Sequence, residues 1–204
     1  MQCKSIITIS RQYGSGGRFI GQKLAENLGI PFYDNEIITL SAEKSGYAQE
    51  LFVKPDQEST TSFMYSLSLF NNVNAAYHMP LNDKIFIIQS GTIKDIAQKG
   101  ACVIVGRCAD YVLREMPNCI SVFIHSDMEH KIKRAIEYYD LPEKKAADTI
   151  MRTNRKRETY YNYYTDKKWG KADNYHICIN SDFIGIDGSV DTIAAFVDAH
   201  QKML

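Results

Sequence analysis

Residues 5–28 read SIITISRQYGSGGRFIGQKLAENL, and this stretch decides the fold. A largely apolar, strand-like run over residues 5–10 leads into a glycine-rich segment and then into a helical pattern over residues 19–28. A glycine-rich turn between a strand and a helix directs backbone N–H groups and the positive end of the helix dipole toward an anion. The sequence therefore predicts a phosphate-binding loop, although a tight turn without a ligand is the alternative. The loop residues are Gly14, Ser15, Gly16 and Gly17.

The predicted loop has no lysine. In the usual phosphate-binding loop, a lysine reaches the outer phosphates and a Ser or Thr hydroxyl contacts Mg²⁺. Here Gly17 stands in the lysine position, so the positive charge has to come from another residue. Arg18 follows that position directly and Arg11 opens the loop, and either can replace the lysine, with a different geometry because a guanidinium is bulkier and binds in a planar fork. Arg18 can equally lie on the solvent side of the helix.

Short β-rich runs alternate with helical patterns along the rest of the chain, which is typical of a parallel sheet covered by helices. Several runs are almost continuously apolar, as expected for strands buried on both faces. We therefore expect an α/β fold with a five-stranded parallel sheet. The expected strands are residues 5–10, 32–33, 101–105, 120–125 and 175–179.

Helical patterns connect the expected strands. Residues 82–99 and residues 189–202 carry apolar side chains at helical spacing. Ser126 and Glu129 form a Ser-x-x-Glu capping box, which predicts the start of another helix. A further helix is expected to restart near Pro142 and to carry a basic, tyrosine-rich stretch.

The length and composition favour one domain. A chain of 204 residues is large enough for one well-buried domain and small for two. Its 45% hydrophobic and 24% charged content is that of an ordinary soluble globular protein. Residues 46–80 mix polar and aromatic side chains, which predicts an inserted helical region on the substrate side or at a subunit interface. A contact between subunits there would make the protein a homo-oligomer.

The sequence favours a cytoplasmic protein without a membrane partner. No apolar run approaches the roughly 18 residues that a membrane helix needs, and the N-terminus has a strand pattern instead of a signal peptide. The five cysteines are scattered without a C-x-x-C pair, which favours buried, reduced thiols over a metal site or a disulfide framework. The histidines show no metal-ligand spacing, so we expect no metal bound directly by the protein.

The net charge of zero argues against generic nucleic-acid binding but conceals an asymmetry. Residues 131–171 contain twelve basic and six acidic side chains, so this segment carries about +6 and the remainder about −6. Such a dipolar layout suits the attraction of a small polyanion to one place. A solvated helical face is the alternative.

Arginines gather within the basic segment. Arg152, Arg155 and Lys156 share one helical face at i, i+3 and i+4, with Arg157 beside them. Like charges at this spacing cost a few tenths of a kcal/mol per pair, which favours a role in binding an anion. Four tyrosines follow within residues 160–164, and this interleaving can also stack single-stranded RNA, which is a further alternative.

Two other positions follow expected strands. Gly106 and Arg107 come directly after the third strand, where ligands bind in open α/β sheets, so Arg107 is expected to contact a phosphate. Asp110 can organise Arg107 or a magnesium-bound water, or it can cap a helix. Asp34 ends the second strand and can hydrogen-bond a base or a sugar, or cap the next helix.

With these residues in view, the sequence resembles the cytidylate kinase-like family of bacterial P-loop nucleotide kinases. The resemblance is carried by four segments in order. They are residues 6–21 (IITISRQYGSGGRFIG), 28–38 (LGIPFYDNEII), 103–113 (VIVGRCADYVL) and 172–181 (ADNYHICINS).

The resemblance implies a three-layer α/β/α domain over residues 1–204, with a small insertion and a helical lid at residues 140–170. It implies phosphate transfer from ATP to a nucleoside monophosphate such as CMP, with Mg²⁺ held mainly through phosphates and water. By position, residues 14–18 would hold the donor phosphates and Arg107 the acceptor phosphate. Catalysis would be mainly charge neutralisation by the arginines at positions 18, 107, 152 and 155. The lid arginines would be Arg152, Arg155 and Arg157.

The chain departs from authentic cytidylate kinases at the loop, where residues 16–19 read GGRF in place of Gly-Lys-Gly-Thr. Their Gly-Arg-Asp becomes Gly-Arg-Cys at residues 106–108, and their lid Asp and Arg are Thr159 and Asn162 here. These differences motivate a second hypothesis, a catalytically degenerate regulatory protein that binds a nucleotide without turning it over.

Overall fold

The computed structural model describes residues 3–47 and 79–203. Its centre is a parallel sheet with the strand order β2-β3-β1-β4-β5. This confirms the expected α/β fold with five parallel strands. The inserted region expected at residues 46–80 lies outside the described residues except at its two ends. The strands are β1 (Ile6–Arg11), β2 (Phe32–Tyr33), β3 (Cys102–Val105), β4 (Cys119–His125) and β5 (Ile177–Asn180).

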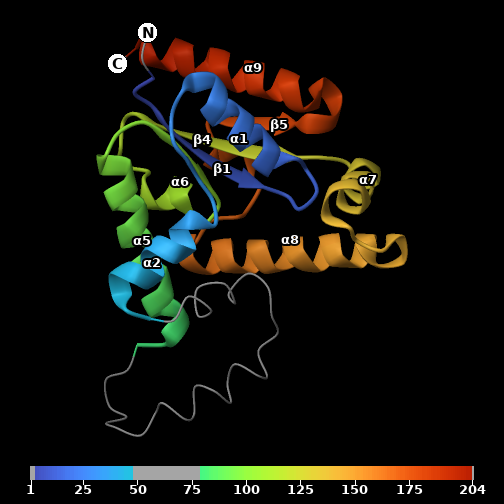
Figure 1. Cartoon of the computed structure of the whole chain (residues 1–204), viewed down its shortest axis with the longest axis horizontal. Coiled ribbons are helices and arrows are strands. Elements are labelled where there is room, and N and C mark those ends of the chain that lie inside the picture. The colour runs from blue at the N-terminus through green and yellow to red at the C-terminus, as the bar shows by residue number, and fades with distance from the viewer. Residues whose placement is uncertain (1–2, 48–78, 204) are drawn as a thin grey trace, which may run out of the picture.

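Two helices, α1 (Gly17–Leu28) and α9 (Ser181–Gln201), cover one face of the sheet (Figure 1). Ile20 and Leu24 of α1 are fully buried against Ile7 and Ile9 of β1 and their neighbours. The other face packs on α5 (Leu81–Gln98), the short α6 (Ala109–Val112) and α2 (Glu36–Ser45), which contacts α5. Because side chains alternate along a strand, each helical layer buries its own half of the strand residues.

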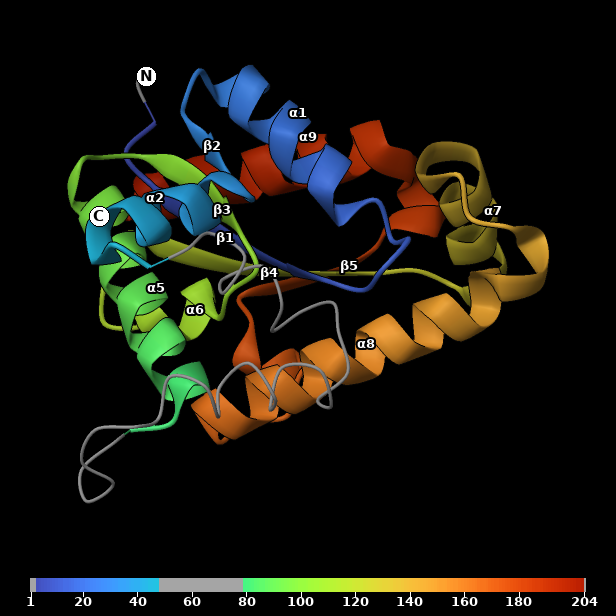
Figure 2. The same ribbon diagram turned by 60° about the horizontal axis from the view of Figure 1, so that its bottom comes forward.

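Two further helices follow β4. They are α7 (Met128–Tyr139) and α8 (Glu143–Thr165), and α8 is a long helix on the side of the sheet away from α1 and α9 (Figures 1 and 2). The C-terminal half of α8 is attached to the core, because Tyr161 is 3% exposed and Tyr164 stacks on Phe86 of α5 with ring centroids 4.1 Å apart. A short 3₁₀ helix, η2 (Ala172–Asn174), leads into β5. In the described part of the chain, no helix is both long and apolar enough to cross a membrane.

Two local predictions were wrong. The capping box at Ser126 and Glu129 is not formed: Asp127 is the N-cap of α7, and the Ser126 hydroxyl donates to Asp182 Oδ1 at 2.8 Å. The last helix begins at Ser181, eight residues before the expected start. It contains a non-helical residue, Gly185 (φ 72°, ψ −179°), and this break interrupts the apolar periodicity on which the prediction depended.

Candidate functional site

The glycine loop connects β1 to α1 at the carboxyl edge of the sheet. Gly14 and Gly16 have φ of 77° and 78°, a left-handed conformation that glycine adopts without steric cost, and Gly16 is the N-cap of α1. A hydrogen bond from the Ser181 hydroxyl to the Ser15 carbonyl, 2.6 Å long, fixes the loop from the side of α9. The first turn of α1 therefore directs its unpaired N–H groups into the space above the loop.

This loop forms one wall of a cleft of about 860 Å³, which we call the main cleft. Cationic side chains reach it from several separate elements: the end of β1, the start of α1, the turn after β3, and α8. These side chains are Arg11, Arg18, Arg107, Arg152, Lys156 and Arg157. Asp34 is the buried acid of the main cleft, and Glu36 contributes a second carboxylate. Such a surface suits a small polyanion.

Asp34 links two of these arginines. Its carboxylate lies 2.8 Å from Nε of Arg18 and 3.8 Å from Nη2 of Arg11, and the residue is 8% exposed. The pair with Arg18 keeps that guanidinium on the outer side of the main cleft, where its side chain is 49% exposed. Asp34 thus lies in the main cleft just after β2, where its carboxylate pairs with arginines, and the N-cap of α2 is Asn35.

Arg107 stands in a turn of unusual backbone conformation. Gly106, Arg107 and Cys108 all have positive φ values of 77°, 57° and 54°. Left-handed non-glycine residues carry strain of order 1–3 kcal/mol and cluster at functional sites. The turn brings Arg107 from the carboxyl end of β3 into the main cleft.

The cationic side chains of α8 are divided between two sides of the helix. Arg152, Lys156 and Arg157 line the main cleft, whereas Arg155 lines a second cleft of about 650 Å³ with His125 and Trp169 among its other residues. Helical spacing predicts one face for Arg152, Arg155 and Lys156, but in the structure these three side chains line two different clefts.

The loop and α8 are hydrogen-bonded to each other. Arg157 Nη1 donates to the Arg11 carbonyl at 3.0 Å, and the Tyr13 amide donates to Asn154 Oδ1 at 2.7 Å. The guanidinium of Arg157 also lies 5.7 Å from the centre of the Tyr13 ring. These contacts place the basic part of α8 directly over the loop.

Asp110 lies apart from the main cleft. Its carboxylate accepts a hydrogen bond of 2.8 Å from the Tyr161 hydroxyl, beneath the C-terminal half of α8. Burial raises the pKa of Asp110, while the Tyr161 hydrogen bond opposes this shift. The two groups join α6 to α8, and Asp110 does not line the cleft with Arg107.

The tyrosines after the arginines do not form an open stacking surface. Tyr161 is buried against Phe123 and Tyr175, and Tyr160 and Tyr164 pack against Phe86. Tyr163 is 70% exposed and is the only one of the four that projects fully into solvent. This packing removes the surface on which an RNA-binding role depended.

Sequence reasoning missed a second group of residues behind the loop, on α7. Lys131 is 7% exposed and its Nζ donates to Gln12 Oε1 at 3.0 Å. Burial lowers the pKa of Lys131, although Asp127 and Asp182 oppose the shift. Arg134 Nη1 lies 3.4 Å from the Gly14 carbonyl and 3.1 Å from Asp182 Oδ1. The basic composition of residues 131–171 was the only sequence signal for this group.

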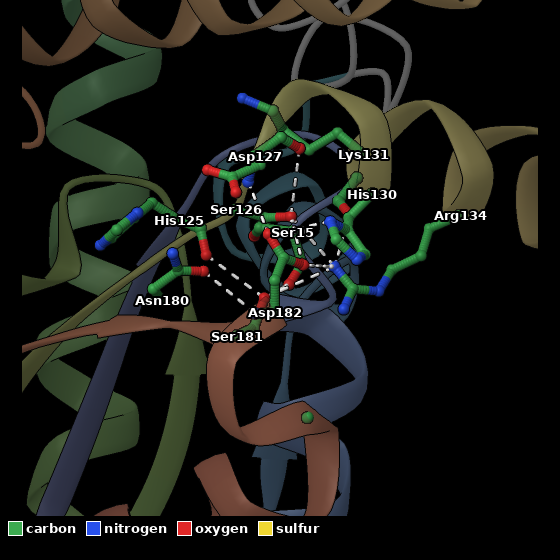
Figure 3. Close-up of polar contacts among 12 residues, drawn as sticks. Ser15, His125, Ser126, Asp127, His130, Lys131, Arg134, Asn180, Ser181 and Asp182 are labelled. Atoms are coloured by element: carbon green, nitrogen blue, oxygen red, sulfur yellow. Dashed lines mark hydrogen bonds and ion pairs between the residues drawn. The ribbon is translucent and has the colours of Figure 1, made fainter.

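Figure 3 shows these side chains where α7, α9 and the loop meet. Asp127, His130 and Asp182 place possible metal-ligand atoms within 4.8 Å of one another. Asp182 already accepts hydrogen bonds from the Asp127 amide (2.6 Å) and the Ser126 hydroxyl (2.8 Å) and pairs with Arg134. Arg134 thus neutralises the charge of Asp182. The contacts among Asp127, Asp182 and Arg134 are those of a structural support for the loop.

Comparisons with known proteins identify the relatives of this chain. A search of curated proteins finds no match. An uncharacterized protein from Eubacterium ventriosum has a crystal structure with 30% sequence identity, a TM-score of 0.73, and coverage of 96% of this chain and 99% of its own.

Two shikimate kinase structures share the fold at lower identity. The enzyme from Bacteroides thetaiotaomicron is 14% identical with a TM-score of 0.55, covering 95% of this chain and 98% of its own. The enzyme from Acinetobacter baumannii, solved in complex with shikimate, is 13% identical with a TM-score of 0.54, covering 97% and 95%. The family model of the cytidylate kinase-like family matches residues 6–183. The chain therefore belongs to the cytidylate kinase-like family, in agreement with the resemblance of its loop and strand segments.

Proposed function

We propose that the protein transfers a phosphoryl group from ATP to a small acceptor, with a nucleoside monophosphate such as CMP as the first candidate. The observation that carries this proposal is the convergence of cationic side chains from β1, α1, the turn after β3, and α8 on one cleft beside the glycine loop. Phosphoryl transfer needs little covalent help from the protein. It needs the reacting groups aligned and the charge on the transferred group neutralised.

The main cleft supports a division of roles between its walls. The loop N–H groups and the N-terminus of α1 are suited to the donor phosphates, and Arg107 is suited to the acceptor phosphate. Arg152, Lys156 and Arg157 of α8 would surround the transferred group from above. Arg155 would act at the rim, because it lines the second cleft. Asp34 would orient Arg11 and Arg18 and present its carboxylate to the acceptor.

In the proposed reaction, the terminal P–O bond of ATP breaks and a new P–O bond forms to a phosphate oxygen of the acceptor. The products are ADP and a nucleoside diphosphate. Mg²⁺ held by phosphate oxygens and water would neutralise part of the phosphate charge. The protein would contribute the arginines and the loop amides.

The test is an assay of ATP consumption with Mg²⁺ against a panel of nucleoside monophosphates. We expect turnover with at least one acceptor, and Arg152→Ala to lower kcat by about 10-fold or more because a charge facing the cleft is lost. Lys144→Ala is the matched control, since Lys144 is an exposed cation in the first turn of α8 outside the main cleft. Absence of turnover with every acceptor would count against the proposal.

A second candidate is a nucleotide-binding regulatory protein without turnover. It is favoured by Gly17 in the lysine position and by the pairing of Arg18 with Asp34. Calorimetric titration with ATP and Mg²⁺ separates the two candidates. Tight binding without phosphoryl transfer to any acceptor supports the regulatory role, whereas transfer supports the enzyme.

A further inference from the structure

The side chain of Arg11 passes between two glycines. A Cβ atom added to Gly17 would lie 2.5 Å from Cβ and 3.0 Å from Cγ of Arg11. A Cβ added to Gly106 would overlap Nη1 of Arg11 and lie 3.3 Å from its Cζ. Carbon atoms that are not bonded to each other pack at about 3.5–4.0 Å, so position 17 has no room for a side chain. At position 106 the φ of 77° already favours glycine, and the contact is with the movable end of the Arg11 side chain. The stem of Arg11 is therefore accommodated by Gly17, and its guanidinium lies beside Gly106.

This packing explains why the loop has no lysine. Any residue at position 17 other than glycine places a Cβ against the stem of Arg11, and a lysine begins with the same Cβ. Relieving such a contact forces side chains out of their preferred rotamers and shifts the backbone, which destabilises a packed site. Arginine at position 11 and lysine at position 17 thus exclude each other sterically.

The side chain of Arg11 lines the main cleft. It lies beside Gly106, next to Arg107, and its Nη2 is 3.8 Å from Asp34 Oδ1. The Arg11 side chain is only 17% exposed, compared with 49% for Arg18. The Arg11 backbone is also fixed by the Arg157 hydrogen bond to its carbonyl. Arg11 is therefore the better positioned of the two candidates, since Arg18 is on the outer side.

We infer that Arg11 supplies the charge of the missing loop lysine, and that position 17 is a glycine because it makes room for the stem of Arg11. On this account Arg11 is a catalytic residue that contacts the outer phosphates of the donor, between the loop and Arg107. A guanidinium presents a planar fork of donors, so it can contact two phosphate oxygens at once. The inference rests on the proposed function for its catalytic part, whereas phosphate binding by Arg11 can be tested without turnover.

The first test exchanges the two positions. Arg11→Gly is expected to lower kcat by about 100-fold with a smaller effect on KM, because the lost donor acts on charge that develops in the transition state. Gly17→Lys alone is expected to be as damaging, since its Cβ meets Arg11. The double variant Arg11→Gly, Gly17→Lys removes the contact with Arg11, leaves the added Cβ 3.3 Å from Cβ of Ile124, and places an ammonium at the usual position of the loop. We expect it to exceed either single variant in kcat by about 10-fold or more.

Two further variants keep the test decisive. Arg11→Lys retains the charge and the stem, so it is expected to recover part of the kcat lost in Arg11→Gly without changing the melting temperature relative to wild type. Arg18→Ala removes the same formal charge from the outer side of the cleft and is expected to have a much smaller effect on kcat. If Arg18→Ala lowers kcat strongly and Arg11→Gly does not, the assignment of Arg11 is wrong.

The second test uses inorganic tripolyphosphate, titrated by calorimetry without an acceptor. We expect Arg11→Gly to weaken its binding by about 10-fold or more, as expected for one lost charged hydrogen-bond donor. Wild-type affinity in Arg11→Gly would overturn the inference, whatever the enzyme assay shows. Weakened binding together with no turnover by the wild type would leave Arg11 as the phosphate-binding residue and would reject the kinase activity instead.

Discussion

Asp182 joins several of the groups that support the loop from behind. It accepts from the Asp127 amide and the Ser126 hydroxyl and pairs with Arg134, which itself reaches the Gly14 carbonyl. Burial would raise the pKa of Asp182, but the hydrogen bonds and the nearby charges prevail and lower it. A carboxylate with a lowered pKa stabilises the fold in its charged form.

We expect Asp182→Asn to lower the free energy of unfolding by about 2 kcal/mol at neutral pH, because charge-assisted hydrogen bonds are lost. The folded pKa lies below the unfolded pKa, so this contribution is present above the unfolded pKa and is lost as the pH falls through the folded pKa. Urea denaturation of both proteins across the acid range measures this. A stability difference that stays constant down to strongly acidic pH would contradict the assignment.

The sequence predicts those parts of the site whose residues are close together in the chain, but not those that depend on contacts between distant residues. Gly14 to Gly17 and Arg11 are neighbours in sequence, so their placement in one loop follows from local pattern. Which of Arg11 and Arg18 lies deeper in the cleft depends on Gly106 and Asp34. These two residues follow other strands and contact the arginines only in the folded state. Lys131 carries no motif, and its approach to Gln12 is set by how α7 packs.

Among the helices, α8 is buried toward both ends, at Ile150 and at Tyr161, and its middle lines the main cleft. Arg152, Lys156 and Arg157 precede the buried residue Tyr161 on the same continuous helix. The assignment of Arg152, Arg155 and Lys156 to one face correctly describes a helix in isolation. Successive residues of a helix are 100° apart around its axis. In the folded protein this separation directs Lys156 into the main cleft and Arg155 into the second cleft.

The anchor of α8 can be tested at Tyr161. We expect Tyr161→Phe to lower the free energy of unfolding by about 1–3 kcal/mol, because Asp110 loses its hydrogen-bond donor in a buried position. The pKa of Asp110, already raised, should rise further, so the folded state holds its proton more tightly. The stability of the variant should therefore fall more steeply than that of wild type as the pH rises from acidic to neutral.

Denaturant midpoints at several pH values measure this effect. Tyr163→Phe is the matched control, since Tyr163 is 70% exposed and its substitution should leave stability unchanged. Equal stability profiles for Tyr161→Phe and wild type would show that the Asp110 contact does not anchor α8.

The break in α9 allows a test of backbone conformation alone. Gly185 has φ 72° and ψ −179°, a combination adopted almost only by glycine, and a Cβ there would meet nothing within 4 Å. We expect Gly185→Ala to lower the free energy of unfolding by about 1–3 kcal/mol through backbone strain. Gly91→Ala, inside α5 with ordinary space for a Cβ, should instead raise it by up to about 1 kcal/mol. Thermal melting of both variants checks the opposite signs.

At the scale of the whole molecule, the central sheet follows from strong and local signals in the sequence. The strands are apolar runs bounded by polar turns. In a parallel sheet the carboxyl ends of all strands lie at the same edge, so the residues that follow the strands come together there. The start of α9 could not be predicted, because residues 181–188 lack a continuous apolar period. The side of α8 that each cationic side chain takes depends on tertiary packing, which sequence spacing does not contain.

The distribution of the five cysteines gives a test of the whole fold. Cys3, Cys102, Cys108 and Cys119 are buried and Cys178 is exposed. Burial raises the pKa of both Cys102 and Cys119 to about 12, so their thiolates are scarce at neutral pH. The pKa of Cys178 is raised as well, by desolvation, so its exposure is the reason that we expect this one thiol to react faster than the other four with a chromogenic disulfide reagent in the native state. All five should react in denaturant. Cys178→Ser should abolish the rapid reaction, and rapid reaction of further thiols would show a looser core.

The steric exclusion between positions 11 and 17 also bears on how such loops diverge. A chain with arginine at position 11 cannot acquire lysine at position 17 in one substitution without a clash, and a chain with lysine there cannot acquire this arginine. The two loop types are then separate solutions joined only through weakened intermediates that lack both cations. Relatives with lysine at the position of Gly17 should accordingly carry glycine at the position of Arg11, because the contact is with the Cβ of residue 11. The identity of these two residues together would sort the members of the family into two lineages.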